Sequence, residues 1–239
     1  MVLQERDRRL LEALGDQMDV VDREQTKVVT GIRSTSRMNE RLLKLTRAGF
    51  LKRVFIGGNQ AVYALAHRKN RSSNQPATGE PLLLFCRHQL EINAVYLALT
   101  YRPLPESVRY LRFRRFREIL APSVPLIPDA YFELEFRGAV RPMFLEVDLG
   151  TESLPVWQRK TREYLQLALS GEFPKLFSQT RFGVLVVTTT PRRLEHLRAE
   201  IARATQKIFY LTTPEAIHAE GLWAAVWWRP SGDQPQKLI

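Results

Sequence analysis

Glycine positions set the organisation of the first 66 residues. Three segments with apolar residues at helical spacing each end at a glycine, at Gly15, Gly31 and Gly49. Glycine ends helices readily because it adopts a left-handed backbone conformation without steric cost. Asp22 and the hydroxyl groups of residues 34–36 precede the second and third segments as helix caps. The pattern predicts three short helices, over residues 3–14, over residues 23–30, and from residues 34–36 to about Ala48.

Two segments with strand-like alternation follow the third helix, over residues 50–56 and 61–65. Between them stands Gly57-Gly58-Asn59-Gln60, whose residue types suit a tight hairpin. Three helices followed by a two-stranded hairpin is the element order of a winged helix-turn-helix. The sequence therefore predicts a DNA-binding domain of this type over residues 1–66, with double-stranded DNA as its partner.

Positive charge is concentrated in the same region. The chain has a net charge of +11, and residues 33–69 hold nine Lys and Arg against Glu40 alone. A second basic focus lies at residues 109–117, where arginines alternate with aromatic residues. A localised basic patch is typical of proteins that bind polyanions, although a solvated basic face is the alternative.

The third predicted helix carries the residues expected to read DNA. Projection at about 100° per residue places a seam of arginine and lysine beside an apolar stripe of Met38, Leu42 and Leu45. Such a helix suits the major groove, with base edges met near its N-terminus and phosphates along its length. An amphipathic helix in a protein-interaction domain is the alternative. The residues expected to contact DNA are Arg33, Ser36, Arg37, Asn39, Arg41, Lys44, Lys52 and Arg53, with Arg112 and Arg114 as a second phosphate-binding set whose alternative is a charged edge strand.

Residues 67–81 are polar and rich in turn formers, which predicts an interdomain linker. The remainder, residues 82–239, has the pattern of a mixed α/β domain, so the whole chain is predicted to be a two-domain α/β protein. The expected helices span residues 83–99, 154–170 and 191–206, with a short one after Pro214. The expected strands span residues 108–113, 130–136, 142–148, 182–189, 207–212 and 222–228.

Acidic residues stand at the ends of two consecutive predicted strands. Asp129 precedes one strand, and Glu146 and Asp148 end the next, on the same face because side chains alternate along a strand. This arrangement resembles the PD-(D/E)xK nuclease-like, restriction-endonuclease-like fold. The resemblance implies that Asp129, Glu146 and Asp148, with Glu91 as a further candidate, hold Mg²⁺ or Mn²⁺.

The lysine of that nuclease signature is replaced by Asp148 in this chain. Lys160 stands in the middle of an apolar helix face formed by Trp157, Tyr164 and Leu167, where a lone lysine needs an anionic partner. Lys160 is therefore a candidate catalytic residue beside Asp129 and Glu146. In a degenerate site, which we slightly favour, it would only neutralise the carboxylates, and no metal would be needed.

Several motifs taken together resemble the plasmid replication-relaxation protein family. They are the N-terminal winged helix, the run from His88 to Asn93, Ile-Pro-Asp-Ala at 127–130, the run from Phe144 to Glu152, and Trp157-x-x-Lys160-x-x-x-Tyr164. The resemblance implies a role in replication or relaxation of plasmid or mobile-element DNA. Two alternatives stay open: a metal-dependent DNA nickase or endonuclease, and a transcriptional regulator with an α/β dimerisation domain.

Other features narrow the function classes. Cys86 is the only cysteine, which excludes an internal disulfide. No Gly-rich phosphate loop predicts a nucleotide cofactor, and no apolar run predicts a membrane span. The N-terminus lacks a secretion signal, so a cytoplasmic location is expected. Trp223, Trp227 and Trp228 predict either core packing or the interface of a homodimer.

Overall fold

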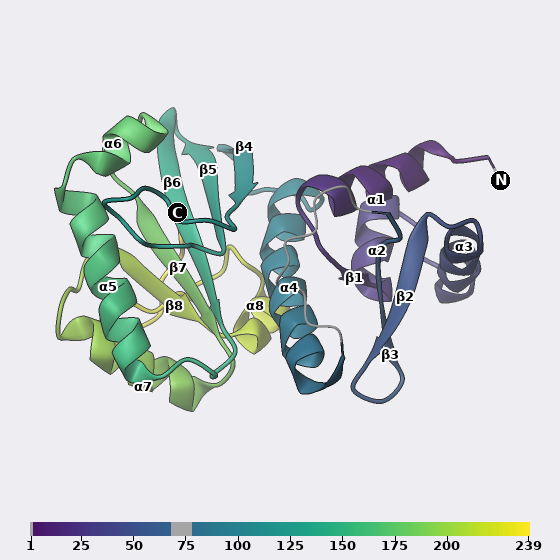
Figure 1. Ribbon diagram of the computed structural model, residues 1–239. Coiled ribbons are helices and arrows are strands. Elements are labelled where there is room, and N and C mark those ends of the chain that lie inside the picture. The colour runs from purple at the N-terminus through teal and green to yellow at the C-terminus, as the bar shows by residue number, and fades with distance from the viewer. Residues whose placement is uncertain (1, 68–77) are drawn as a thin grey trace. The chain divides into compact units, whose positions relative to one another are not determined.

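The computed structural model describes residues 2–67 and 78–239 (Figure 1). The chain is mixed α/β with two sheets and divides into two compact units, Met1–Pro103 and Leu104–Ile239. The linker predicted over residues 67–81 falls largely on residues 68–77, which lie outside the described residues. Among the described helices, none combines the length and the apolar character needed to cross a bilayer.

The first unit contains the three predicted helices and the hairpin. Asp22 Oδ1 accepts the Gln25 N–H at 2.8 Å as the N-cap of the second helix, and Gly31 ends that helix with φ 72°. A short strand that the sequence did not predict pairs antiparallel with the second hairpin strand, giving a three-stranded sheet of order β1-β3-β2. The elements are α1 Glu5–Asp16, β1 Val21–Asp22, α2 Arg23–Thr30, α3 Thr35–Arg47, β2 Leu51–Ile56, β3 Gln60–Leu65 and α4 Gly79–Thr100.

Helix α4 packs with the first unit. Its Leu82, Cys86 and Leu90 form one buried cluster with Ile56 and Val62 of the hairpin. The domain boundary predicted at residues 81–82 therefore differs from the structure, where the division follows Pro103. Helix α4 is rich in apolar residues, and eleven of its residues are buried. A helix that is apolar on most sides gives no sequence signal for which neighbour it packs against.

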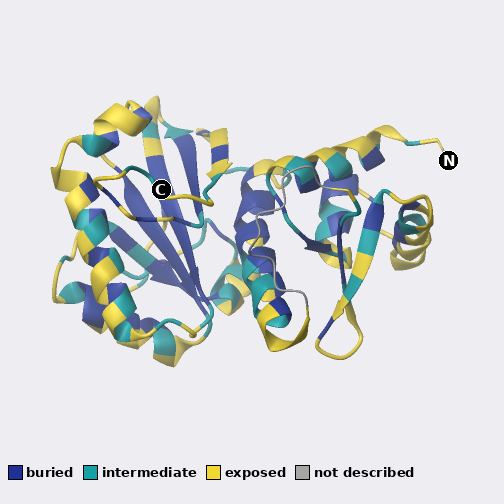
Figure 2. Cartoon of the chain, in the orientation of Figure 1, coloured by how far each residue is buried: buried dark blue, intermediate teal, exposed yellow. Residues whose placement is uncertain are grey.

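The second unit is built on a five-stranded sheet of order β4-β5-β6-β7-β8. The β4–β5 and β5–β6 pairs are antiparallel, whereas β6–β7 and β7–β8 are parallel. Helices α5, α6 and α7 pack on one face of the sheet, whose central strands are buried (Figure 2). Phe144, Trp157 and Tyr164 belong to one buried cluster there. The elements are β4 Val108–Arg115, β5 Ala130–Phe136, β6 Ala139–Asp148, α5 Leu154–Leu169, α6 Glu172–Phe177, β7 Gly183–Thr188, α7 Pro191–Ala202, β8 Phe209–Thr212 and α8 Pro214–Glu220.

The C-terminal segment differs from the prediction of a strand over residues 222–228. Only isolated bridges form there, between Leu211 and Trp228 and between Trp227 and Gln236. Trp227 is fully buried, and its indole N–H donates to the Leu222 carbonyl at 2.9 Å. Buried Trp227 therefore belongs to the core of its own unit, whereas Trp223 and Trp228 are partly exposed, and the homodimer stays a prediction.

Candidate nucleic-acid interface and carboxylate cluster

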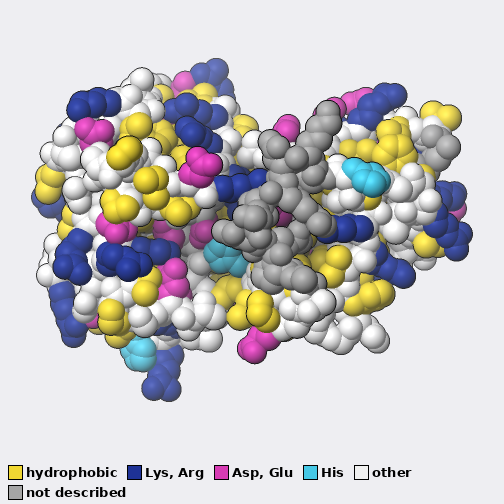
Figure 3. Space-filling view, in the orientation of Figure 1, with side chains coloured by type: hydrophobic (Ala, Val, Ile, Leu, Met, Phe, Trp, Pro, Cys, Tyr) yellow, Lys and Arg dark blue, Asp and Glu magenta, His cyan; other side chains and the backbone are white. Residues whose placement is uncertain are grey.

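Helix α3 has a buried side and an exposed polar side. Met38, Leu42 and Leu45 are fully buried, as the apolar stripe predicted. Ser34 caps the helix by accepting the Arg37 N–H at 3.4 Å. The exposed polar residues on and beside the helix are Arg33, Ser34, Thr35, Ser36, Arg37, Asn39, Glu40, Lys44 and Arg47. Figure 3 shows dark blue Lys and Arg side chains at the edge of the molecule where α3 lies.

Two of these arginines are without an ion-pair partner in the part of the chain that the structure describes. Neither Arg33 nor Arg37 forms an ion pair with another described residue, whereas Lys44 pairs with Glu40 at 2.5 Å across one helical turn. Both side chains of the Lys44–Glu40 pair are exposed, and ion pairs between exposed side chains contribute little stability. Lys44 can therefore exchange Glu40 for another anion at low cost. Exposed Arg47, in the last turn of α3, extends the same basic side, although it was not among the residues predicted to contact DNA.

Arg41 differs from its prediction as a phosphate contact. Its Nε donates to Asp7 Oδ1 at 2.8 Å, and its Nη2 contacts Asp7 Oδ2 and the Val2 carbonyl. The Asp7 side chain is completely buried, and Arg41 is 13% exposed. Burial acts to raise the Asp7 pKa, but hydrogen bonds from Arg41 and from the Gln4 N–H outweigh it, so the pKa lies below its usual value. Arg41 thus ties α3 to α1.

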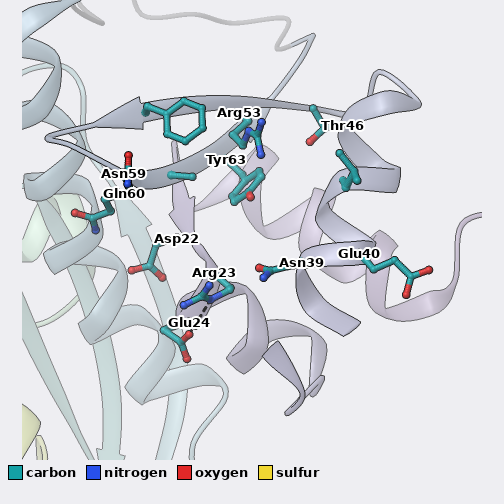
Figure 4. A pocket seen from close by; sticks show the side chains of 13 residues that line it. Asp22, Arg23, Glu24, Asn39, Glu40, Thr46, Arg53, Asn59, Gln60 and Tyr63 are labelled. Carbon is teal, nitrogen blue, oxygen red and sulfur yellow. Dashed lines mark hydrogen bonds and ion pairs between the residues drawn. The ribbon is translucent and has the colours of Figure 1, made fainter. Parts of the chain in front are cut away.

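A groove separates α3 from the β2–β3 hairpin (Figure 4). Its volume is about 750 Å³. Arg53, on the hairpin, is exposed and lies over the Phe55 ring, with its Cζ 4.9 Å from the ring centroid. Lys52 is partly buried and lies on the opposite face of β2 from Arg53, because successive side chains alternate. The residues lining the groove are Asp22, Arg23, Glu24, Asn39, Glu40, Leu43, Thr46, Arg53, Phe55, Asn59, Gln60, Ala61 and Tyr63.

The second basic focus lies on β4, an edge strand of the larger sheet. Arg112 pairs with buried Glu133 at 2.6 Å and lies over the Tyr131 ring. Arg109 pairs with Glu135 at 2.5 Å, and Arg114 lies over the Phe116 ring. Arg109 and Arg112 therefore pair with acids on the neighbouring strand β5. This arrangement favours the charged-edge interpretation over phosphate binding for Arg112.

The carboxylate cluster forms around Glu146 on β6. Lys160 Nζ lies 2.9 Å from Glu146 Oε2 and 2.9 Å from Glu152 Oε1. The Tyr164 hydroxyl donates to Glu146 Oε1 at 2.6 Å. Glu146 is only 1% exposed, so both of its oxygens depend on these two donors. The structure thus places Lys160 beside a carboxylate, as its position on the apolar face of α5 predicted.

Burial controls the protonation behaviour of this cluster. It raises the Glu146 pKa, and nearby Asp129 adds to the effect, while Lys160 and Tyr164 act against it. Burial acts to lower the Lys160 pKa, but the carboxylates of Glu146 and Glu152 outweigh it and hold the pKa above its ordinary value. The lysine therefore stays protonated at neutral pH and balances the charge of its carboxylate neighbours.

Asp148 belongs to a separate ion pair. Arg193, at the start of α7, donates to Asp148 Oδ2 at 2.7 Å and to Oδ1 at 3.1 Å. The Thr188 hydroxyl on β7 donates to the same carboxylate at 2.8 Å. The third acid, Asp129, accepts a hydrogen bond at its Oδ2 from the Val147 N–H at 2.7 Å. The three acids are therefore held by different partners.

The divalent metal implied by the nuclease resemblance would need several carboxylate oxygens aimed at one point. Both oxygens of Glu146 accept from Lys160 and Tyr164, and both oxygens of Asp148 accept from Arg193. Within residues 2–67 and 78–239, no three His, Cys, Asp or Glu side chains gather as a metal-binding group. Glu91 lies on α4 of the first unit. The donor set fits ion pairs and does not fit a divalent cation.

The ion-pair partners of Asp148 and Arg41, which are Arg193 and Asp7, were not predicted from the sequence. Arg193 and Asp7 each lie more than thirty positions from the residue they pair with. One signal was available for Arg193, since it follows Thr190-Pro191, where a helix begins beside the end of a parallel strand. No comparable pattern marked Asp7.

A family model described as "Replication-relaxation" matches residues 5–179 of the chain. Comparison with curated proteins gave no match, and comparison with solved structures gave none either. The matched range spans all of the first unit's elements and continues through α6 of the second unit. It therefore includes α3, the hairpin, Glu146 and Lys160.

Proposed function

The chain belongs to the replication-relaxation family, and we propose from this premise that it binds double-stranded DNA through its first unit, which we interpret as a winged helix-turn-helix. Its role would be in replication or relaxation of plasmid or mobile-element DNA, or in the regulation of these processes. The observation that carries the proposal is the two-sided character of α3. One side is fully buried, and the other presents Ser36, Arg37 and Asn39 to solvent, with exposed Arg33 just before the helix.

The proposed docking follows from where these side chains lie. Ser36, Arg37 and Asn39 occupy the first turns of α3, and this end of a recognition helix meets base edges in the major groove. Arg33 precedes the helix, and Lys44 and Arg47 stand in its last turns, where they would meet phosphates on either side. Arg53 on the hairpin would contact the flanking backbone. Arg41 has a structural role in this proposal, because its guanidinium forms an ion pair with buried Asp7.

The second unit supplies a stable α/β body in this proposal. The Glu146–Lys160 and Asp148–Arg193 pairs join β6 to α5 and α7. The resemblance to a nuclease fold is then one of strand and helix order, with lysine and arginine in place of a metal. We assign no cleavage step to these residues, because their oxygens are used by the protein's own donors.

The proposal is tested by salt-dependent DNA binding. The double variant Arg33→Ala/Arg37→Ala should bind duplex DNA more weakly and lower the slope of log K against log salt by about 0.9 for each phosphate that it no longer neutralises. The matched control is Arg141→Ala/Arg192→Ala, which removes the same charge from exposed positions of the second unit. An equal decrease of affinity in both double variants would show a net-charge effect and contradict docking through α3.

A further inference from the structure

The groove between α3 and the hairpin carries an exposed aromatic ring. Phe55 is 57% exposed although it lies within strand β2. Its partner across the hairpin is Ala61, whose methyl group is too small to cover the ring. Leu43, on the α3 side of the groove, is 40% exposed. Two apolar side chains therefore line the same open groove without covering one another.

The polar side chains of the groove that have no ion-pair or hydrogen-bond partner among the described residues are neutral or cationic. Each acid in the lining already has a partner: Asp22 caps α2, Glu24 pairs with Lys27, and Glu40 pairs with Lys44. In contrast, the side chains of Asn39, Asn59 and Gln60 hydrogen-bond to no other described residue. In Figure 4, Asn39 points from α3 into the space facing Tyr63, whereas Glu40 points away from it.

This combination matches the chemistry of a nucleobase. A base has a flat π face that stacks on an aromatic ring, and an edge of donors and acceptors that pairs with amides. The Arg53 guanidinium, held over the Phe55 ring, adds positive charge where the attached phosphate would lie. The groove volume of about 750 Å³ is within the range of small-molecule sites, so a whole nucleotide fits.

We infer that this groove accepts an unpaired nucleobase stacked on Phe55, so that the protein binds DNA containing unpaired bases more tightly than fully paired DNA. The inference rests on the proposed docking of α3 on DNA. A base in a duplex is stacked between its neighbours and cannot enter the groove. A locally opened segment, with its bases already unstacked, supplies one at little cost.

The test compares two labelled DNAs by fluorescence anisotropy with the full chain. One is a short duplex, and the other is the same duplex with a central loop of mispaired bases that includes a fluorescent adenine analogue quenched by stacking. Wild-type protein should prefer the looped DNA and quench the analogue. Phe55→Ala should weaken binding to looped DNA by about five-fold or more beyond any effect on duplex binding, as expected for removal of one base–aromatic stack in addition to the loss of the ring under Arg53.

Two further variants make the result specific. Phe55→Trp should keep the preference because the larger ring still stacks. Ile119→Ala, which removes a comparably exposed apolar side chain from the second unit, should change neither affinity. Equal affinity of wild-type protein for both DNAs, or equal weakening of both by Phe55→Ala, would overturn the inference while the proposed function stands. Failure of folded wild-type protein to bind either DNA would overturn the proposed function itself.

Discussion

The ammonium group of Lys160 lies 2.9 Å from a Glu146 carboxylate that is almost completely buried. A second carboxylate, Glu152, lies at the same distance from that ammonium. Lys160 would keep Glu152 as a partner without Glu146, but the buried Glu146 carboxylate has no other cation as a partner among the described residues, so the lysine is needed by the fold whether or not the cluster has any chemistry.

Removing this lysine should destabilise the second unit. Lys160→Met leaves the buried Glu146 carboxylate without its cation, and the expected decrease is about 3 to 5 kcal/mol of unfolding free energy. Adding Glu146→Gln to that variant should restore much of this stability. All four tryptophans lie in the second unit, so urea unfolding followed by tryptophan fluorescence reports on it alone.

The control for this prediction is Lys175→Met. Lys175 pairs with Glu172 on the surface, with 70% of the lysine side chain exposed. Its removal should cost less than about 1 kcal/mol. A similarly small cost for Lys160→Met would show that the buried pair contributes no more than a surface pair does.

Substitution of Arg41 should lower the stability of the first unit, whereas substitution of Arg37 should lower its DNA affinity. Arg41→Ala leaves the buried Asp7 carboxylate without its cation and should lower the unfolding free energy of the first unit by about 3 kcal/mol. Arg37→Ala should leave stability unchanged and lower DNA affinity, because its side chain is exposed and unpaired among the described residues. Far-UV circular dichroism gives the unfolding curve, and the transition not seen by tryptophan fluorescence belongs to the first unit. An Arg41→Ala variant of normal stability but lower salt slope would reverse this assignment.

Acid should destabilise the first unit through Asp7. The pKa of Asp7 is lower in the folded protein than its ordinary value of 3.8. Stability from this ionised group is therefore present above 3.8 and is lost as the pH falls through the folded value. Asp7→Asn should be less stable at neutral pH, because Arg41 loses its partner, and should lose less on acidification. Parallel acid titrations of the two proteins would contradict the prediction.

Divalent metal should not stabilise the second unit. A metal bound to the native state raises the unfolding midpoint with its concentration, but the oxygens of Glu146 and Asp148 are already engaged. The tryptophan-monitored midpoint should therefore stay constant as Mg²⁺ or Mn²⁺ is added. A midpoint that rises with Mn²⁺ in the wild type and not in Glu146→Gln would instead support the nuclease alternative.

The sequence predicted the local elements of the first unit well. The second helix was predicted over residues 23–30, as observed, because its signals are local: Asp22 caps it and Gly31 ends it. The hairpin was predicted for the same reason, since Gly57 and Gly58 provide the left-handed turn positions. Lys160 was predicted from helical periodicity, which placed a lone charge on a buried face.

Tertiary structure decided which charges are free. Arg37 and Arg41 stand one turn apart in the same basic seam, and only the packing of α1 brings Asp7 against Arg41. In the same way, Asp148 is bound by Arg193 from α7, which the order of the parallel strands brings beside β6. Helical and strand periodicity fix the face on which a side chain stands, because they depend on backbone geometry within one element. The partner on that face comes from a distant segment, so the role of each charge was decided by the folded chain.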